Sequence, residues 1–174
     1  MSVVNADIEP LAIHFADDGL VPNNPMPFLV YKGVVALDHD HPEQTIEKLF
    51  RANGWGDMWR NSVYNFLHYH ATVHEVLGIA RGSARVRFGG DKGKVLEISA
   101  GDVAILPAGT GHQCISASPD FSVVGAYPPG SPMDLVRPNK DAHAKALKTI
   151  PMVALPRTDP VMGADGPLVR LWKR

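Results

Sequence analysis

Two histidines separated by one residue, His68 and His70, are the first feature of the sequence that could do chemistry. In a β-strand, residues two apart project to the same face, so both imidazoles could reach one metal ion. The chain contains 8 histidines, and such a pair also arises by chance, as His39 and His41 illustrate. The pair alone is therefore weak evidence for a metal site.

A second segment, which ends at His112, strengthens the interpretation. Together the two segments resemble the motifs of the cupin superfamily, the RmlC-like jelly rolls. The first cupin motif, G-x5-H-x-H-x3-4-E-x6-G, is matched by His68, His70, Glu75 and Gly82. The second, G-x5-P-x-G-x2-H-x3-N, is matched by Gly101, Pro107, Gly109 and His112. Ser62 and Ser116 replace a glycine and an asparagine at positions that are not ligands, and the chain is most similar to the uncharacterised bacterial YjlB-type branch.

The resemblance implies an all-β fold, a double-stranded β-helix or jelly-roll barrel, and one divalent transition metal. The implied ligands are His68, His70, Glu75 and His112. Imidazoles and one carboxylate suit Fe, Mn, Ni, Zn, Co or Cu, and a six-coordinate ion with four protein ligands keeps about two positions open. We therefore expect a metal-dependent enzyme, oxidoreductase (dioxygenase-like) or isomerase-like, acting on a small organic or carbohydrate-like molecule. The alternative is a non-catalytic small-molecule-binding or sensor cupin.

The neighbours His74 and Glu75 compete for the metal, because only one of them can face the interior. Unbroken alternation from His68 and His70 would put His74 on the metal face. A turn or bulge within residues 71–73 would reset the alternation and bring in Glu75 together with larger aliphatic residues. The second register fits the cupin spacing. It predicts Glu75 as the ligand and His74 as a pocket residue that orients a ligand or substrate.

Two aromatic residues, Tyr64 and Phe66, share strand parity with His68 and His70, so they are candidates for the substrate pocket or, equally, for the core. Cys114 is better explained as a small buried strand residue than as a reactive thiol. The acidic and histidine residues just before Pro42 are better explained as the capping residues of a helix. The sequence identifies no catalytic residue and no organic cofactor.

The elements that must position these residues change type at Gly54. Ile46, Leu49 and Phe50 recur at helical spacing, which predicts a helix over residues 42–52. Short Val-, Ile-, Phe- and Tyr-rich segments cut by glycines predict at least five antiparallel strands between Ser62 and Tyr127. Weaker signals predict strands at 28–31 and 34–37, a helix at 141–148 and a terminal strand at 168–172.

The organisation expected is one cupin domain over residues 1–174. Its barrel core would span 62–127, preceded by an arm and helix over 1–61. A wrap over 128–174 would follow, because 9 of the 15 prolines lie from Pro119 onward and prolines are poor in central strands.

Charge and composition exclude several partners. Lys and Arg total 17 against 18 Asp and Glu, and without a basic run this balance argues against nucleic acid and membrane surfaces. The first residues are acidic rather than apolar, which predicts a cytoplasmic protein without a signal peptide. The single cysteine permits no internal disulfide. The expected partners are a small-molecule ligand or substrate and a second copy in a homodimer. The strand before His68 has apolar residues on both faces, and the face that does not fill the barrel would be covered by the second copy or by the chain's own N-terminal arm.

Overall fold

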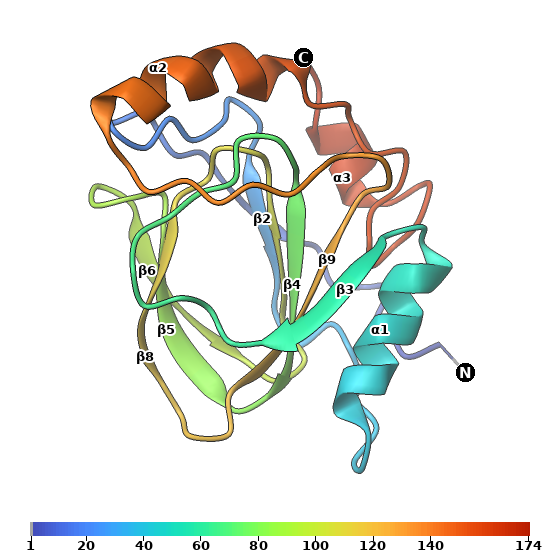
Figure 1. Cartoon of the computed structure of the whole chain (residues 1–174). Coiled ribbons are helices and arrows are strands. Elements are labelled where there is room, and N and C mark those ends of the chain that lie inside the picture. Colours follow the sequence, from blue (N-terminus) through green and yellow to red (C-terminus); the bar gives the residue numbers. More distant parts are fainter. Residues whose placement is uncertain (1) are drawn as a thin grey trace.

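Two antiparallel sheets face each other in the computed structural model, which describes residues 2–174 (Figure 1). The six-stranded sheet has the order β1-β2-β7-β4-β9-β3 and the three-stranded sheet the order β6-β5-β8. This arrangement confirms the all-β jelly roll. The strands are β1 (Leu11–Ile13), β2 (Phe28–Tyr31), β3 (Gly56–Asn61), β4 (Glu75–Arg81), β5 (Ser83–Phe88), β6 (Lys94–Ser99), β7 (Val103–Leu106), β8 (His112–Ala117) and β9 (Ser122–Tyr127).

The helices lie outside the sheets. They are α1 (Pro42–Ala52), α2 (Lys140–Thr149), the short 3-10 helix η1 (Ile150–Met152) and α3 (Pro167–Leu171). The predicted helices at 42–52 and 141–148 are confirmed, as are the strand at 28–31 and at least five strands within 62–127. Among residues 2–174, no helix combines the length and the apolar character needed to cross a bilayer.

Two predicted strands are wrong. Residues 168–172 are largely helical, because Pro167 suits a first helical turn and the buried Leu168 and Trp172 are four apart, a spacing that fits a helix as well as a strand. Residues 34–37 form only a single bridge, between Val35 and Val4. The sheet also extends beyond the expected core of 62–127, since β1, β2 and β3 all precede it.

Strand β4 divides its side chains between two cores. Leu77 and Ile79 belong to the cluster between the two sheets. Val76 and Ala80 belong to the cluster on the other face, under α1 and the C-terminal segment. The chain bends at Ala71–Thr72, before β4 begins. The structure therefore adopts the second register, in which the alternation is reset and Glu75 faces the same side as Leu77.

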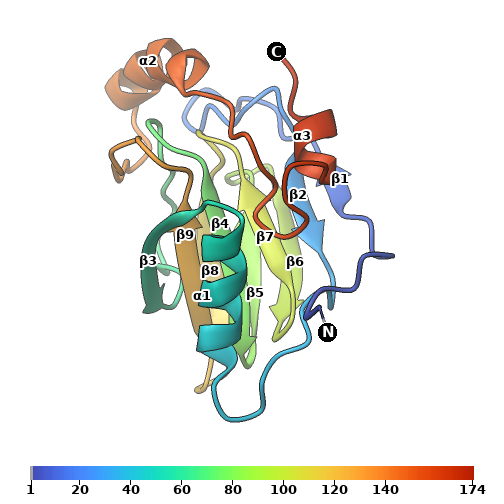
Figure 2. The ribbon, with the colours of Figure 1, turned by 90° about the vertical axis from the view of Figure 1, so that its right-hand side faces the viewer.

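Helix α1 lies directly against the six-stranded sheet (Figure 2). This close approach depends on Gly78 of β4, where an added Cβ would lie 2.5 Å from Ile46 Cγ2 and 2.9 Å from Phe50 Cζ. We expect Gly78→Ala to lower the free energy of unfolding by about 1–3 kcal/mol, because α1 would have to move outward. Denaturant unfolding measures this loss.

Gly56→Ala is the matched control, since a Cβ at that strand position meets nothing within 4 Å. Its effect should stay within about 0.5 kcal/mol. Equal stability of the two variants would contradict the tight packing of α1 on β4.

The homodimer stays a prediction. Of the apolar residues just before His68, which a second copy was expected to cover in part, Val63 is buried in the cluster between the sheets and Tyr64 is 52 % exposed. Light scattering at micromolar concentration checks it, and a monomer would favour cover by the chain's own residues.

Candidate metal centre

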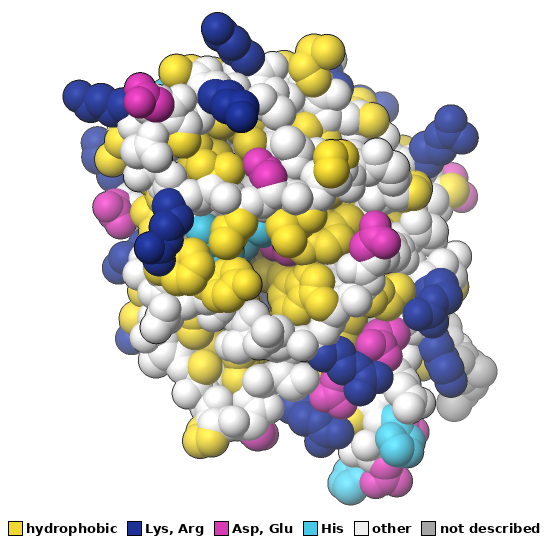
Figure 3. Space-filling view, viewed as in Figure 1, with side chains coloured by type: hydrophobic (Ala, Val, Ile, Leu, Met, Phe, Trp, Pro, Cys, Tyr) yellow, Lys and Arg dark blue, Asp and Glu magenta, His cyan; other side chains and the backbone are white. Residues whose placement is uncertain are grey.

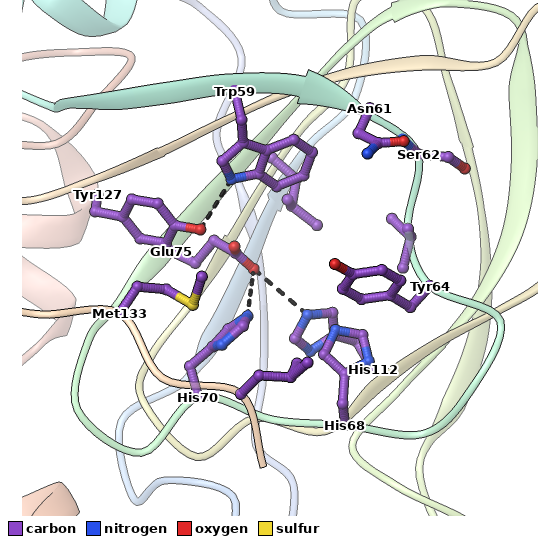
Figure 4. Close-up of a pocket in the computed structure, with 13 residues that line it drawn as sticks. Trp59, Asn61, Ser62, Tyr64, His68, His70, Glu75, His112, Tyr127 and Met133 are labelled. Carbon is purple, nitrogen blue, oxygen red and sulfur yellow. Dashed lines mark hydrogen bonds and ion pairs between the residues drawn. The ribbon is translucent and has the colours of Figure 1, made fainter. Parts of the chain in front are cut away.

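Four side chains converge at one end of the barrel (Figure 4). His68 and His70 come from the segment between β3 and β4, Glu75 is the first residue of β4, and His112 is the first residue of β8. The segment with the first two histidines is not the regular strand that was predicted. His68 forms an isolated antiparallel bridge with His112, in which their backbones exchange hydrogen bonds of 3.2 and 2.9 Å.

The three histidines present the same ring nitrogen. Nδ1 of His68 lies 2.9 Å from the Phe66 carbonyl, and Nδ1 of His112 lies 3.0 Å from the Thr110 carbonyl. Nδ1 of His70 is hydrogen-bonded to the Asp134 carbonyl. A carbonyl can only accept, so each Nδ1 carries a proton and each neutral ring keeps its lone pair on Nε2. This is the usual way in which a protein orients imidazoles toward a metal.

The positions of the ligand atoms fit one ion. The three histidines are buried, and each offers a ring nitrogen within 4.8 Å of the others. Oε1 of Glu75 lies 3.4 Å from Nε2 of His70 and 3.4 Å from Nε2 of His112. Two atoms each about 2.1 Å from one ion are separated by about 3.0 Å at a right angle and by about 3.4 Å at a tetrahedral angle. The separations therefore suit atoms that share an ion.

Glu75 Oε1 supplies a second test of this fit. The atom is buried and accepts no well-formed hydrogen bond from residues 2–174; its neighbours are Nε2 of His70 and of His112, both at the long distance of 3.4 Å. An unsatisfied carboxylate oxygen in a protein interior is costly, and coordination of a cation is one of the few ways to compensate it. The donor set, three neutral nitrogens and one carboxylate, also matches what divalent transition metals bind.

Burial and mutual contact shift the pKa values in the cluster. Burial, with the neighbouring His112, lowers the pKa of His68 to about 3. Burial alone would lower the pKa of His70, but the Glu75 carboxylate beside it raises that pKa to about 9. Burial alone would raise the pKa of Glu75, but His70 and His112 hold it below its ordinary value. Glu75 is thus an anion throughout the neutral range.

His74 lies away from this cluster. It is 1 % exposed, packs against Trp172 with ring centroids 4.9 Å apart, and does not line the pocket above the other histidines. Its Nδ1 accepts a 2.9 Å hydrogen bond from the Ala108 amide, so in the neutral ring the proton is on Nε2. Burial lowers its pKa to about 4. The expected role of His74 in orienting a ligand therefore needs correction, because the bend at Ala71–Thr72 turns its side chain to the other face.

A loop far along the chain holds the ligand segment in place. The Asp134 carboxylate accepts hydrogen bonds from the amides of Ala71 and Thr72 and from the Thr72 hydroxyl. The same residue's carbonyl binds His70. Sequence reasoning missed Asp134, since nothing in the pattern around it indicates that it folds back onto residues 70–72.

A pocket of about 300 Å³ opens above the four side chains. Its histidines are visible at the floor of a hollow that is rimmed by hydrophobic side chains (Figure 3). Besides the four converging residues, the lining consists of the aromatic Trp59, Tyr64 and Tyr127, the apolar Val63, Leu77, Met133 and Leu135, and the polar Asn61 and Ser62.

Of the two aromatic residues expected at the pocket, Tyr64 lines it and Phe66 does not. Phe66 stacks on Tyr64 with ring centroids 4.8 Å apart, and the Arg137 guanidinium lies 3.9 Å from its ring centre. Phe66 thus supports Tyr64 from outside the pocket. Cys114 is half-buried on β8 and is not among the lining residues.

Trp59 and Tyr127 form a pair that the sequence did not indicate. The Trp59 indole N–H donates a 2.8 Å hydrogen bond to the Tyr127 hydroxyl. Burial and the adjacent Glu75 carboxylate raise the pKa of Tyr127, so its hydroxyl keeps its proton. Because the oxygen already accepts from Trp59, that proton is free to point toward Glu75 (Figure 4).

Comparisons with known proteins identify the family. A family model described as "Cupin" matches residues 55–149. The chain is 38% identical over 159 residues to the uncharacterized protein YjlB of Bacillus subtilis, which covers 91% of this chain and 93% of the relative.

Two solved structures are similar to parts of this chain at low identity. One is a Klebsiella pneumoniae protein with a double-stranded β-helix domain (18% identity, 78% of this chain and 90% of that chain, TM-score 0.37). The other is acireductone dioxygenase from Bacillus anthracis with a cadmium ion in its active centre (18% identity, 56% of this chain and 63% of that chain, TM-score 0.35).

Proposed function

Because the chain belongs to the cupin family, we propose that it binds one divalent transition metal through His68, His70, Glu75 and His112 and acts as a metal-dependent enzyme on a small organic molecule. One observation carries the proposal. Three Nε2 lone pairs and a partnerless buried carboxylate oxygen converge at the floor of a pocket that opens to solvent.

The metal would act as a Lewis acid or redox centre with coordination positions left for a substrate. The chain's own residues would orient the ligands and enclose the substrate. Backbone carbonyls orient the three imidazoles with Nε2 toward the floor of the pocket, and apolar side chains surround the positions that a substrate would occupy. Of the enzyme classes expected from the sequence, an oxidoreductase makes the fullest use of open positions, with an isomerase as the nearest alternative.

Elemental analysis of protein purified without a metal-binding tag is the first test. We expect about one equivalent of a divalent transition metal, lost on dialysis against a chelator and restored by Fe(II), Mn(II), Ni(II) or Zn(II). Reconstituted protein is then assayed for oxygen consumption and product formation on a panel of small organic molecules. Protein that binds none of these ions would refute the metal site. Metal-dependent ligand binding without turnover would instead identify a binding or sensor cupin.

Tyr127→Phe tests the contribution of the Trp59–Tyr127 pair, which lies beside Glu75, to metal binding. We expect metal affinity to fall by a few-fold to about 10-fold, because Glu75 loses a neighbouring hydroxyl whose proton can point toward it, while the aromatic ring stays in place. Titration of chelator-treated protein with Zn(II) in competition with a chromogenic chelator measures the change.

Tyr69→Phe is the matched control, since its hydroxyl is also buried but has no hydrogen-bond partner among residues 2–174, and its ring packs in the hydrophobic cluster that includes Val21 and Ile150. Metal affinity in this variant should equal that of the wild type. Equal losses in both variants would mean that Tyr127 does not act through Glu75.

A further inference from the structure

The lining of the pocket above the proposed metal site contains almost no charged side chains. Outside the four ligands, none of the residues that line it is Lys, Arg, Asp or Glu. The Arg137 guanidinium lies over the ring of Phe66, which is outside the pocket, and Arg137 is not part of the lining. A molecule in this pocket would therefore find its charge partner only at the metal.

The charge at the floor follows from the ligand set. A divalent ion has two positive charges and a carboxylate ligand, Glu75, would remove one, while imidazoles bind metals as neutral rings. One net positive charge remains, which a single negative group on the bound molecule would neutralise. A second negative group would be taken out of water without a partner, which is strongly unfavourable.

The side chains that form the walls of the pocket indicate the chemical character of the uncharged part of the bound ligand. Trp59, Tyr64 and Tyr127 present aromatic surface, and Leu77, Met133 and Leu135 add apolar surface. Aromatic side chains gain from contact with another ring beyond the area buried. The polar groups are too few for the many hydroxyls of a sugar, and about 300 Å³ is at the small end for ligand pockets.

We propose, building on the metal site above, that this pocket takes a compact aromatic monoanion, with its single acidic oxygen group on the metal and its uncharged ring between Trp59, Tyr64 and the apolar residues. Dianions, phosphorylated compounds and free sugars are excluded by the same features. The proposal replaces the broad expectation of a small organic or carbohydrate-like molecule by one chemical class.

A series of carboxylates tests the proposal, because the carboxylate that would bind the metal stays the same while the hydrocarbon part of the molecule changes. Calorimetric titration of Zn(II)-loaded protein is expected to show benzoate binding at least about tenfold more tightly than acetate. Benzoate should also exceed cyclohexanecarboxylate by about two- to tenfold, because only the former is aromatic. Equal affinities within either pair would overturn the aromatic assignment.

The limit of one charge is tested by two molecules of similar shape. Terephthalate carries a second carboxylate where 4-nitrobenzoate carries an uncharged group. We expect terephthalate to bind at least about tenfold more weakly than 4-nitrobenzoate. Tighter binding of terephthalate would overturn the proposal, since the pocket mouth would then supply a cation, with Arg137 the residue in reach of it.

Two variants at exposed positions locate the effect without threatening the fold. Tyr64→Ala should lower the affinity for benzoate by about threefold to tenfold and leave acetate unchanged, so acetate serves as the internal control for the metal. Met133, 56 % exposed, lies at the pocket mouth, and Met133→Arg should raise the affinity for terephthalate about tenfold by supplying the missing cation. No change in either variant would overturn the placement of the ring.

Metal content is measured on each sample before titration. Protein without metal would refute the proposed function, whereas metal-loaded protein with the wrong order of carboxylates would refute only the ligand class.

Discussion

Glu75→Gln is expected to lose most of its bound metal, with an affinity lower by more than about 100-fold. The amide keeps the size of the side chain but removes the negative charge, and losing a direct ligand should exceed the 10–100-fold typical of residues that only orient one. Metal content and competitive titration at neutral pH measure the effect. Occupancy of the wild type should also fall as the pH drops below about 9, because the Glu75 carboxylate raises the pKa of His70 to about 9 and protons then compete with the metal for that imidazole.

His74→Gln provides the contrast, because the two residues are adjacent and both buried. We expect wild-type metal content in this variant, together with lower stability, since His74 Nδ1 accepts the hydrogen bond of the buried Ala108 amide. The two substitutions should therefore separate metal binding from stability. Metal loss in His74→Gln and retention in Glu75→Gln would reverse the assignment and make the site all-histidine.

The largest loss of stability is expected at Asp159, far from the pocket. Its carboxylate is fully buried and accepts four hydrogen bonds, from the Tyr31 hydroxyl at 2.7 Å and from the amides of Val161, Met162 and Leu168 at 2.8, 3.0 and 3.2 Å. Asp159→Ala leaves all four donors without a partner. We expect the free energy of unfolding to fall by about 3–5 kcal/mol, which lowers Tm by roughly 6–20 °C.

Tyr31→Phe removes only one of these four bonds and should cost about 1 kcal/mol. Thermal and denaturant unfolding of both variants, with metal content held equal, give the comparison. If Asp159→Ala cost no more than Tyr31→Phe, the carboxylate would not be the group that holds the C-terminal segment to the sheet.

Sequence reasoning worked best where local pattern and fold agree. The spacing of Ile46, Leu49 and Phe50 specified α1, and glycine-punctuated apolar segments specified the strands from β4 to β9. The reset of alternation before Glu75 was predicted because continued alternation would have placed smaller residues in the barrel and because the reset fits the cupin spacing. Apart from that family spacing, these arguments use neighbouring residues only.

The parts that failed depend on contacts between distant segments. Asp134 reaches back to residues 70–72, and Trp59 of β3 meets Tyr127 of β9. No local spacing reveals such pairs, because tertiary packing alone brings them together. The helix at Pro167–Leu171 was predicted as a strand for a related reason. The buried residues Leu168 and Trp172 are four apart, and that spacing fits the period of a helix as well as that of a strand.

The Asp134 carbonyl, which contacts Nδ1 of His70, affects how strongly His70 would bind a metal, although Asp134 is not itself one of the proposed ligands. The electron density on an imidazole depends on what accepts its other proton, and here that acceptor belongs to a loop without any motif residue. Insertions or substitutions around residues 131–136 could therefore alter reactivity while every ligand stays unchanged. Relatives that share both motifs can differ in chemistry through this loop, and a chain shortened before it would keep the three histidines and Glu75 but lose the carbonyl that accepts the His70 proton.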